Sequence, residues 1–198
     1  MPFPLDHRAA HLCIDMQRLF AEASPWHVPW MPRILPQIMS LAERCPARTI
    51  FSRFIPPTTP EEAQGAWRDY YSEWQAVTRE HLDSRLLDLL PALAALVPPA
   101  RIINKAVYSA LGQPAVCNQL RRDGVTTVIV TGGETDVCVL STVMDAVDAG
   151  FRVVLPTDAL CSVSDKTHDA LLTLYRERFS LQIETTTVGD ILGRWNCG

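Results

Sequence analysis

The stretch VTTVIVTGGETDVCVLSTVMDAVDAG, residues Val125–Gly150, decides the fold that this sequence predicts. It begins with Val125–Thr131, a nearly continuous run of β-branched residues that is typical of a strand buried on both faces of a parallel sheet. Two glycines break the run, and apolar residues then recur at helical spacing until Gly150 ends the helix. We therefore expect a buried strand, a sharp turn and a helix in direct succession.

Cys138 falls in the first turn of this expected helix, directly after the glycine turn. Thr135 and Asp136 offer two side chains that would cap the helix start. Free backbone N–H groups and the positive end of the helix dipole both favour a thiolate at such a position. A cysteine packed beneath a helix is often inert, however, so position alone leaves a nucleophile and a structural cysteine as alternatives.

The rest of the chain alternates between expected strands and expected helices. Strands are expected at Ala9–Ile14, Arg48–Ile55, Arg101–Val107, Val125–Thr131, Phe151–Leu155 and Ser180–Glu184. Further helices are expected at Pro32–Arg44, where Pro36 should limit the first turn, and at Gln113–Asp123, Asp165–Arg178 and Val188–Trp195. The segment Thr58–Glu80 is expected to be irregular and Leu82–Leu96 partly helical. This alternation predicts right-handed crossovers and a parallel sheet with helices on both faces.

Charge and composition narrow the classes of protein. The chain has 198 residues, with 18 Lys and Arg against 22 Asp and Glu and a formal net charge of −4. No basic run stands out, so nucleic acid is not expected as a partner. Leu86–Ala100 is the most apolar long segment, but Asp88 and several prolines interrupt it, which argues against a membrane span. Length predicts one domain over residues 1–198, and MPFPLDHRAA at the start lacks the pattern of a signal peptide.

The cysteines show no C-x-x-C pair and no zinc-like spacing. They are Cys13, Cys45, Cys117, Cys138, Cys161 and Cys197. Free thiols, and with them a cytoplasmic protein, are the simplest expectation.

Three chemically useful side chains follow or end expected strands. Asp15 follows the first strand, Lys105 lies at the end of the third, and Cys138 follows the fourth. In parallel sheets, ligands bind beyond the carboxyl ends of the strands, near the point where strand order reverses. Each residue alone is weak support, since acids at strand ends often cap and lysines there are usually solvated. Together on one edge they predict a site.

The sequences around these residues are specific. Asp15 in LCIDMQ, Lys105 in INKAVYSAL and Cys138 in VTGGETDVCV resemble the three signature motifs of the isochorismatase-like cysteine hydrolases, which include nicotinamidases and N-carbamoylsarcosine amidases. The resemblance implies a three-layer α/β/α sandwich with a six-stranded parallel sheet and Rossmann-like topology. It also implies an Asp15, Lys105 and Cys138 catalytic set and a cis peptide between Gly133 and Glu134.

The implied reaction is hydrolysis of a C–N bond, in an amide or carbamoyl group of a small molecule. Cys138 would attack the carbonyl carbon and form a thioester, while Asp15 would carry protons and Lys105 would hold the two acids together electrostatically. Backbone N–H groups of Glu134 and Cys138 would bind the developing oxyanion.

Departures from the family pattern concern the substrate. Nicotinamidases that resemble this chain hold a metal with an acid and two histidines after strand two, where this sequence has FSRFIPPTTPEEA. We therefore expect no catalytic metal and no cofactor. In the family pattern this position is usually small or apolar. Glu134 is therefore a solvent-facing turn residue, a partner for a nearby base such as Arg53, or a group that recognises a polar or cationic substrate. The candidate substrate-binding residues are Arg53, Trp67, Tyr70 and Tyr108.

Other function classes and the assembly state remain open at this level. A thiol-independent vinyl-ether hydrolase of the isochorismatase type would not need Cys138, and a non-catalytic ligand-binding or assembly protein would not need the set of three. Trp67, Tyr70, Tyr71 and Trp74 are more often core or interface than pocket. With the apolar C-terminal helix they predict more apolar surface than one domain covers, hence a homodimer or homotetramer.

Overall fold

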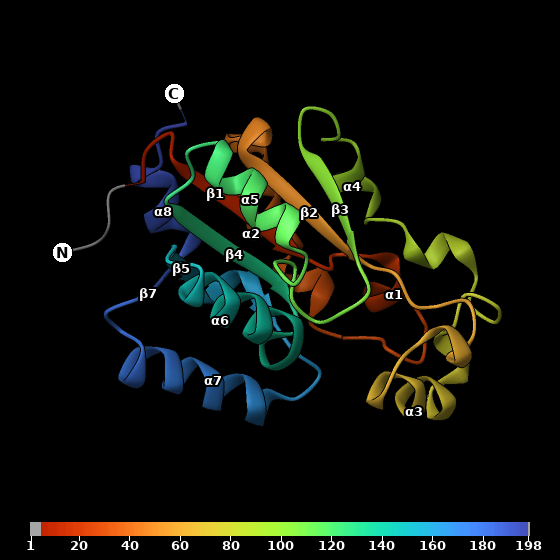
Figure 1. The fold of residues 1–198 in the computed structure, drawn as a ribbon. Coiled ribbons are helices and arrows are strands. Elements are labelled where there is room, and N and C mark those ends of the chain that lie inside the picture. Colours follow the sequence, from red (N-terminus) through yellow and green to blue (C-terminus); the bar gives the residue numbers. More distant parts are fainter. Residues whose placement is uncertain (1–4, 198) are drawn as a thin grey trace.

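A parallel sheet forms the middle layer of the computed structural model, which describes residues 5–197 (Figure 1). The ends of the expected domain, residues 1–4 and 198, lie outside the described part. The strand order is β3-β2-β1-β4-β5-β7, with all pairs parallel. The strands are β1 (Ala9–Ile14), β2 (Thr49–Phe54), β3 (Arg101–Lys105), β4 (Thr127–Gly133), β5 (Arg152–Pro156) and β7 (Ile183–Thr186). The six expected strands are confirmed, and a seventh, β6 (Leu160–Cys161), pairs with the end of β4.

Helices cover both faces of this sheet and complete the three layers. One face carries α2 (Met31–Arg44) and α8 (Val188–Arg194), and the other carries α5 (Pro114–Arg122), α6 (Leu140–Asp148) and α7 (Asp165–Arg178) (Figure 1). Two short helices, α1 (Arg18–Ala21) and α4 (Pro91–Ala94), lie in the connections. Among the described residues, no helix is both long and apolar enough to cross a bilayer.

Helix α2 differs from the expectation at its start. It begins at Met31 and continues through Pro36, which was expected to limit it. The missing N–H at Pro36 costs one helical hydrogen bond. Its apolar stripe of Met31, Ile34, Ile38, Leu41 and Ala42 is buried, and we attribute the continuity of the helix to this packing.

The prediction of an irregular Thr58–Glu80 segment is wrong in its middle. Helix α3 spans Ala66–Glu73, after Gly65 in a left-handed conformation at φ 56°. The aromatic residues at positions 67, 70, 71 and 74 are spaced i, i+3, i+4 and i+7, which is the period of one helix face. The signal for α3 was therefore present in the aromatic spacing.

Gly132 lets the two central strands approach closely at their carboxyl ends. It pairs with Ile14 across β1 and β4 and has φ 101°, a conformation that favours glycine. A Cβ at this position would lie 2.1 Å from the carbonyl oxygen of Ile14. Only glycine fits there, and the close approach places the residues after β1 beside the turn after β4.

The cysteines are not all free, which corrects the sequence expectation. Cys45, at the end of α2, and Cys197 form a disulfide across 152 positions of the sequence. Cys13, Cys117, Cys138 and Cys161 are free and buried. The expectation of a cytoplasmic protein depended on free thiols, and Cys45 and Cys197 are not free thiols.

Candidate active site

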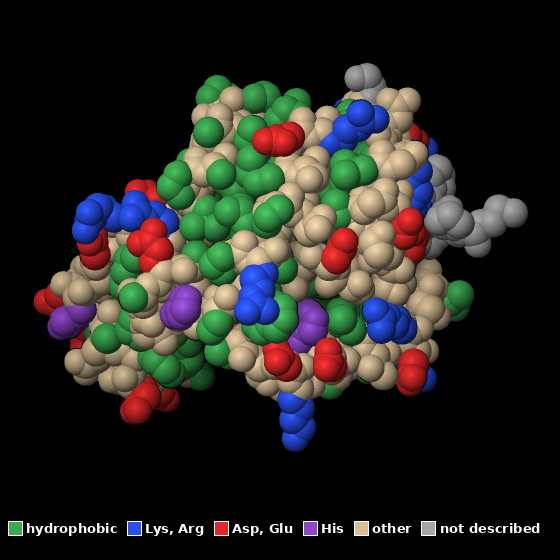
Figure 2. All heavy atoms as spheres, turned by 180° about the vertical axis from the view of Figure 1, so that it is seen from behind, with side chains coloured by type: hydrophobic (Ala, Val, Ile, Leu, Met, Phe, Trp, Pro, Cys, Tyr) green, Lys and Arg blue, Asp and Glu red, His purple; other side chains and the backbone are tan. Residues whose placement is uncertain are grey.

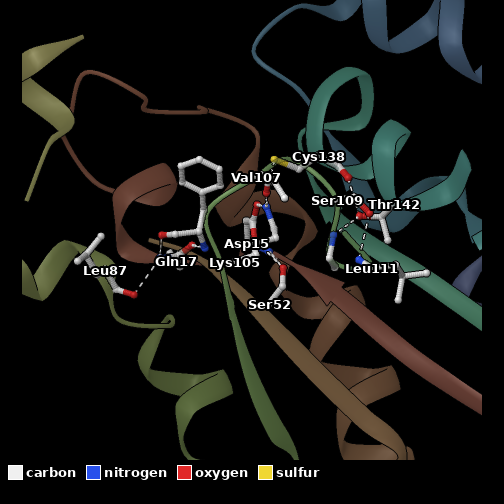
Figure 3. Close-up of polar contacts among 12 residues, drawn as sticks. Asp15, Gln17, Ser52, Leu87, Lys105, Val107, Ser109, Leu111, Cys138 and Thr142 are labelled. Carbon is white, nitrogen blue, oxygen red and sulfur yellow. Dashed lines mark hydrogen bonds and ion pairs between the residues drawn. The ribbon is translucent and has the colours of Figure 1, made fainter. Parts of the chain in front are cut away.

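Asp15, Lys105 and Cys138 come together at the carboxyl edge of the sheet, as expected (Figure 3). Lys105 Nζ lies 2.7 Å from Asp15 Oδ2 and 3.4 Å from Cys138 Sγ. Asp15 directly follows β1, Lys105 is the last residue of β3, and Cys138 lies in the turn after β4. All three residues are buried. A carboxylate, an ammonium and a thiol thus share one site that is nearly closed to water.

Asp15 is held from two sides. Its Oδ1 accepts a hydrogen bond of 2.6 Å from the Ser52 hydroxyl, and the Asp15 backbone N–H donates to Ser52 Oγ at 3.2 Å. The other carboxylate oxygen faces Lys105. Asp15 is in the left-handed region at φ 53°, which aspartate tolerates better than most residues. These bonds to charged groups set the orientation of the carboxylate.

Lys105 directs its ammonium group at three acceptors and an aromatic ring. Besides Asp15 and Cys138, Nζ donates to the Val107 carbonyl oxygen at 3.2 Å, and it lies 4.7 Å from the centre of the Phe54 ring. Burial by itself would lower the pKa of Lys105, but the Asp15 and Cys138 groups outweigh it and raise that pKa above its ordinary value. The lysine therefore stays charged in the folded protein.

Cys138 lies in a wide π-helical turn, Thr135–Val139, that leads into α6. The carbonyl oxygen of Glu134 accepts hydrogen bonds from the N–H groups of Val137 and Val139. The expectation that Thr135 and Asp136 cap this helix is wrong. Both side chains instead bind the segment after β5: the Thr135 hydroxyl donates to the Cys161 carbonyl, and Asp136 accepts from the hydroxyls of Ser162 and Thr167.

The expected lowering of the Cys138 pKa is also corrected. Burial raises the pKa of the Cys138 thiol, the Asp15 carboxylate raises it further, and Lys105 opposes both. The reason is the charge of the site: Asp15 and Lys105 already neutralise each other, so losing the thiol proton to solvent would leave a buried net negative charge. Transfer of that proton to Asp15 keeps the site neutral, so Asp15 is its natural acceptor.

An aromatic cavity of about 340 Å³ lies close to this site, and its lining includes neighbours of the three residues but not the three themselves. Lys105 belongs to the lining of a second cavity of about 520 Å³. Phe54, whose ring lies over Lys105 Nζ, forms part of the wall of the aromatic cavity, as does Val137, the neighbour of Cys138. Tyr70 and Tyr108 line it as expected. Burial raises the pKa of Tyr70 to about 12 and also raises that of Tyr108, so both phenols are neutral at ordinary pH.

Two other expected substrate contacts are not in this wall. Arg53 donates to the Asn104 side chain at 3.0 Å and lies 3.5 Å from Asp88, so its suggested pairing with Glu134 is wrong. Successive residues of a strand point to opposite faces, and Phe54 faces the cavity. Trp67 stands behind Tyr108, with ring centres 4.7 Å apart, and lines the second cavity.

Glu134 lines the aromatic cavity with a half-buried carboxyl group. Its Oε2 accepts hydrogen bonds from the Val163 N–H at 2.8 Å and from the Ser162 hydroxyl at 3.4 Å. Burial raises the pKa of this carboxyl, the Val163 bond opposes the rise, and Asp136 adds to it. The peptide bond between Gly133 and Glu134 is cis.

Several residues that shape the site were not among the predicted site residues. Ser52 is a polar residue in a buried strand, which is a usable signal, and Gln17 lies within the LCIDMQ sequence. The buried Gln17 amide donates to the Phe54 and Leu87 carbonyls and accepts from the Phe54 N–H, which fixes the end of β2 (Figure 3). Trp26 lines the cavity from a loop that carried no pattern at all.

The described donor side chains near the site do not form a metal centre. In the part of the chain described, no group of three or more His, Cys, Asp and Glu side chains could hold a metal ion. The segment after β2, where the family resemblance implies a metal, offers Glu61 and Glu62 without histidine. The residues present do not fit such a centre.

Comparison with known proteins identifies the family. The Isochorismatase domain model matches residues 9–187. Nicotinamidase 3 of Arabidopsis thaliana is 27% identical over 165 residues, which are 83% of this chain and 78% of that protein. A cysteine hydrolase from Pseudomonas syringae pv. phaseolicola 1448A is 26% identical with a TM-score of 0.80, covering 98% of this chain and 95% of that one. Pyrazinamidase of Pyrococcus horikoshii in complex with zinc shares the fold, with a TM-score of 0.68 and 22% identity over 91% of this chain and 99% of that one. The chain therefore belongs to the isochorismatase domain family of hydrolases.

Proposed function

We propose that this protein hydrolyses a C–N bond, in an amide or carbamoyl group of a small molecule, through a thioester on Cys138. The observation that supports this most directly is the contact of Lys105 Nζ with both Asp15 and Cys138, beside a cavity of small-molecule size. Lys105 Nζ thus bridges the proposed base, Asp15, and the proposed nucleophile, Cys138.

Acylation begins with transfer of the thiol proton to Asp15. Cys138 Sγ then attacks the carbonyl carbon, and the electron pair moves to the carbonyl oxygen. Backbone N–H groups of Glu134 and Cys138 stabilise this oxyanion, each contributing about 3 kcal/mol. As the C–N bond breaks, Asp15 returns the proton to the leaving nitrogen, and the acyl group remains on sulfur.

Hydrolysis of the thioester repeats these roles with water. Asp15 takes a proton from the water molecule that attacks the thioester carbon. When the C–S bond breaks, that proton passes to Cys138 Sγ and the acid leaves. Lys105 keeps its positive charge throughout. When Asp15 is protonated, this ammonium group balances the negative charge of each oxyanion.

A broad screen of small amides, carbamoyl compounds, esters and vinyl ethers with wild type and Cys138→Ala tests this function. We expect amide turnover by wild type, loss of turnover in the variant, and a mass increase on Cys138 that equals the acyl group when the reaction is quenched early. Turnover that survives Cys138→Ala would instead indicate the thiol-independent reaction, and no turnover by wild type would indicate a non-catalytic role.

Self-association as a homodimer or homotetramer is part of the proposal, for a reason that differs in part from the one first expected. The C-terminal helix is covered within the chain, since Val188, Ile191 and Trp195 are buried, whereas Trp74 of the aromatic segment is 38% exposed. Hydrophobic side chains also gather over α4 and the edge strand β3 (Figure 2), where Ile102 is equally exposed. Such surfaces usually mark interfaces. Light scattering at micromolar concentration should exceed the monomer mass.

A further inference from the structure

The wall of the cavity beside Cys138 is mostly aromatic. Its aromatic residues come from distant parts of the chain and are Phe20, Trp26, Phe54, Tyr70, Trp74 and Tyr108. Trp26 packs against four of the others. Its ring centre lies 6.1 Å from that of Phe20, 5.8 Å from Phe54, 6.1 Å from Tyr70 and 6.4 Å from Trp74. The faces of such rings are negative, so a wall of this kind attracts cations.

Glu134 adds a carboxyl group to this wall. Its Oε2 is occupied by Val163 and Ser162, whereas no residue in the described part of the chain donates to Oε1. One carboxylate oxygen is thus fixed by the protein while the other remains available to a ligand.

The lining of the cavity, as the structure describes it, contains no lysine or arginine to balance this carboxylate, and its basic side chain is that of His27. Lys105 lies behind the Phe54 ring, and its charge is neutralised by Asp15 at 2.7 Å. Arg53 is engaged with Asn104 and Asp88. An anionic substrate would therefore find no lysine or arginine in the described wall, whereas a cation finds both rings and a carboxylate.

We propose that the substrate of this enzyme is an amide that carries an ammonium group, with the cation held between the aromatic wall and Glu134. This proposal rests on the proposed amide hydrolysis and names its substrate class. The cavity, at about 340 Å³, limits the substrate to a small molecule. Glu134 is the specificity residue, because it lines the cavity and one of its carboxylate oxygens accepts no hydrogen bond from the described part of the chain.

Two amides of equal shape test the charge directly. Trimethylammonioacetamide and 3,3-dimethylbutanamide differ only by nitrogen in place of carbon at the branch point. Binding is measured by calorimetry with the Cys138→Ala protein, which does not depend on turnover. We expect the cationic amide to bind roughly tenfold more tightly or better. Equal affinities, tighter binding of the neutral amide, or no heat with either at millimolar concentration would overturn the proposal and leave the proposed hydrolysis standing.

Variants then assign the preference to named residues. Glu134→Gln in the Cys138→Ala background should reduce the cationic-to-neutral affinity ratio at least threefold, and Trp74→Leu, at the rim of the cavity, should also reduce it. Glu61→Gln removes the same charge from the exposed surface and should leave the ratio unchanged. Because both ligands are compared on one protein, a general loss of folded material cancels. An undiminished ratio in Glu134→Gln would contradict the role of Glu134.

The same ratio measured as kcat/KM in catalytically intact protein gives a second test. It should fall as pH falls through the raised pKa of Glu134, because protonation removes the carboxylate charge. If hydrolysis fails while the binding preference persists, the proposed function is wrong and the cation site remains. If hydrolysis proceeds with no preference at any pH, the cation site is wrong and the proposed function remains.

Discussion

Lys105 Nζ and Asp15 Oδ2 lie 2.7 Å apart, with side chains that are 2% and 1% exposed. The two opposite charges are therefore shielded from water by the protein and neutralise each other. Cys138 is the third group of this site. The Asp15 carboxylate raises the pKa of its thiol, and the Lys105 ammonium group lowers it. Removing one charge at a time should move the Cys138 pKa in opposite directions.

Asp15→Asn should lower the pKa of Cys138, because the carboxylate that raises it is gone while Lys105 remains charged. Iodoacetamide labelling of Cys138 should then begin at lower pH than in wild type. Amide turnover should fall by about 10²-fold or more, since the base is lost. Peptide mass spectrometry across pH measures the labelling. A labelling profile shifted to higher pH would contradict the charge argument.

Lys105→Met should have the opposite effect on the thiol. Without the ammonium group, burial and Asp15 both oppose the thiolate, so Cys138 should be alkylated more slowly at every pH near neutrality. Lys166→Met, which removes a positive charge from the exposed surface at the start of α7, is the matched control and should label like wild type. Equal rates for Lys105→Met and Lys166→Met would show that Lys105 does not set thiol reactivity.

Cys138 should be the first cysteine to react in native protein without reductant. Burial raises the thiol pKa of Cys13, Cys138 and Cys161 alike. Of these three, Cys138 is the one with a lysine in contact, Lys105 Nζ at 3.4 Å, which favours its thiolate. Cys117 is the comparison of choice, because it is 9% exposed against 7% for Cys138. Cys45 and Cys197 should label only after reduction of their disulfide. Faster labelling of Cys117 would weaken the assignment of the nucleophile.

Activity should not depend on a metal ion. The prediction follows from the donor set, since the segment after β2 lacks the histidine pair that a metal centre of the family needs. Prolonged dialysis against a strong chelator should leave amide turnover unchanged. Turnover that is lost on dialysis and restored by zinc, iron or manganese would refute it.

Buried His11 should make the folded state less stable in mild acid. Burial lowers its pKa from about 6.5 to about 3, and a hydrogen bond of 2.8 Å joins its Nε2 to Thr131 Oγ1. Below about pH 6.5 the unfolded chain binds a proton that the folded protein does not, so His11 reduces the free energy of unfolding by about 1.4 kcal/mol per pH unit down to about pH 3.

Urea unfolding of wild type and His11→Gln at pH 7, 6 and 5 measures this effect. Other ionisable groups contribute to both proteins, so the difference between the two slopes isolates His11. We expect the variant to lose stability less steeply below pH 6.5. Parallel slopes would mean that His11 is protonated in the folded protein.

Local patterns in the sequence were enough for the framework of the fold. The run of β-branched residues in Val125–Thr131 and the helical spacing that ends at Gly150 depend only on near neighbours, so β4 and α6 could be predicted. The same is true of the order in which Asp15, Lys105 and Cys138 follow their strands. Even α3 was encoded locally, in the spacing of its aromatic residues.

Tertiary structure alone decided how these groups act on one another. Whether Cys138 is a thiol or a thiolate depends on burial and on the charges of residues 33 and more positions away, which no local pattern records. The disulfide between Cys45 and Cys197 and the cavity around Trp26 likewise join segments that are distant in sequence. Distances through space follow from the path of the whole chain. The sequence by itself therefore determined which chemical groups reach the edge of the sheet, and only the tertiary structure determined their charge state and the cation-attracting wall beside them.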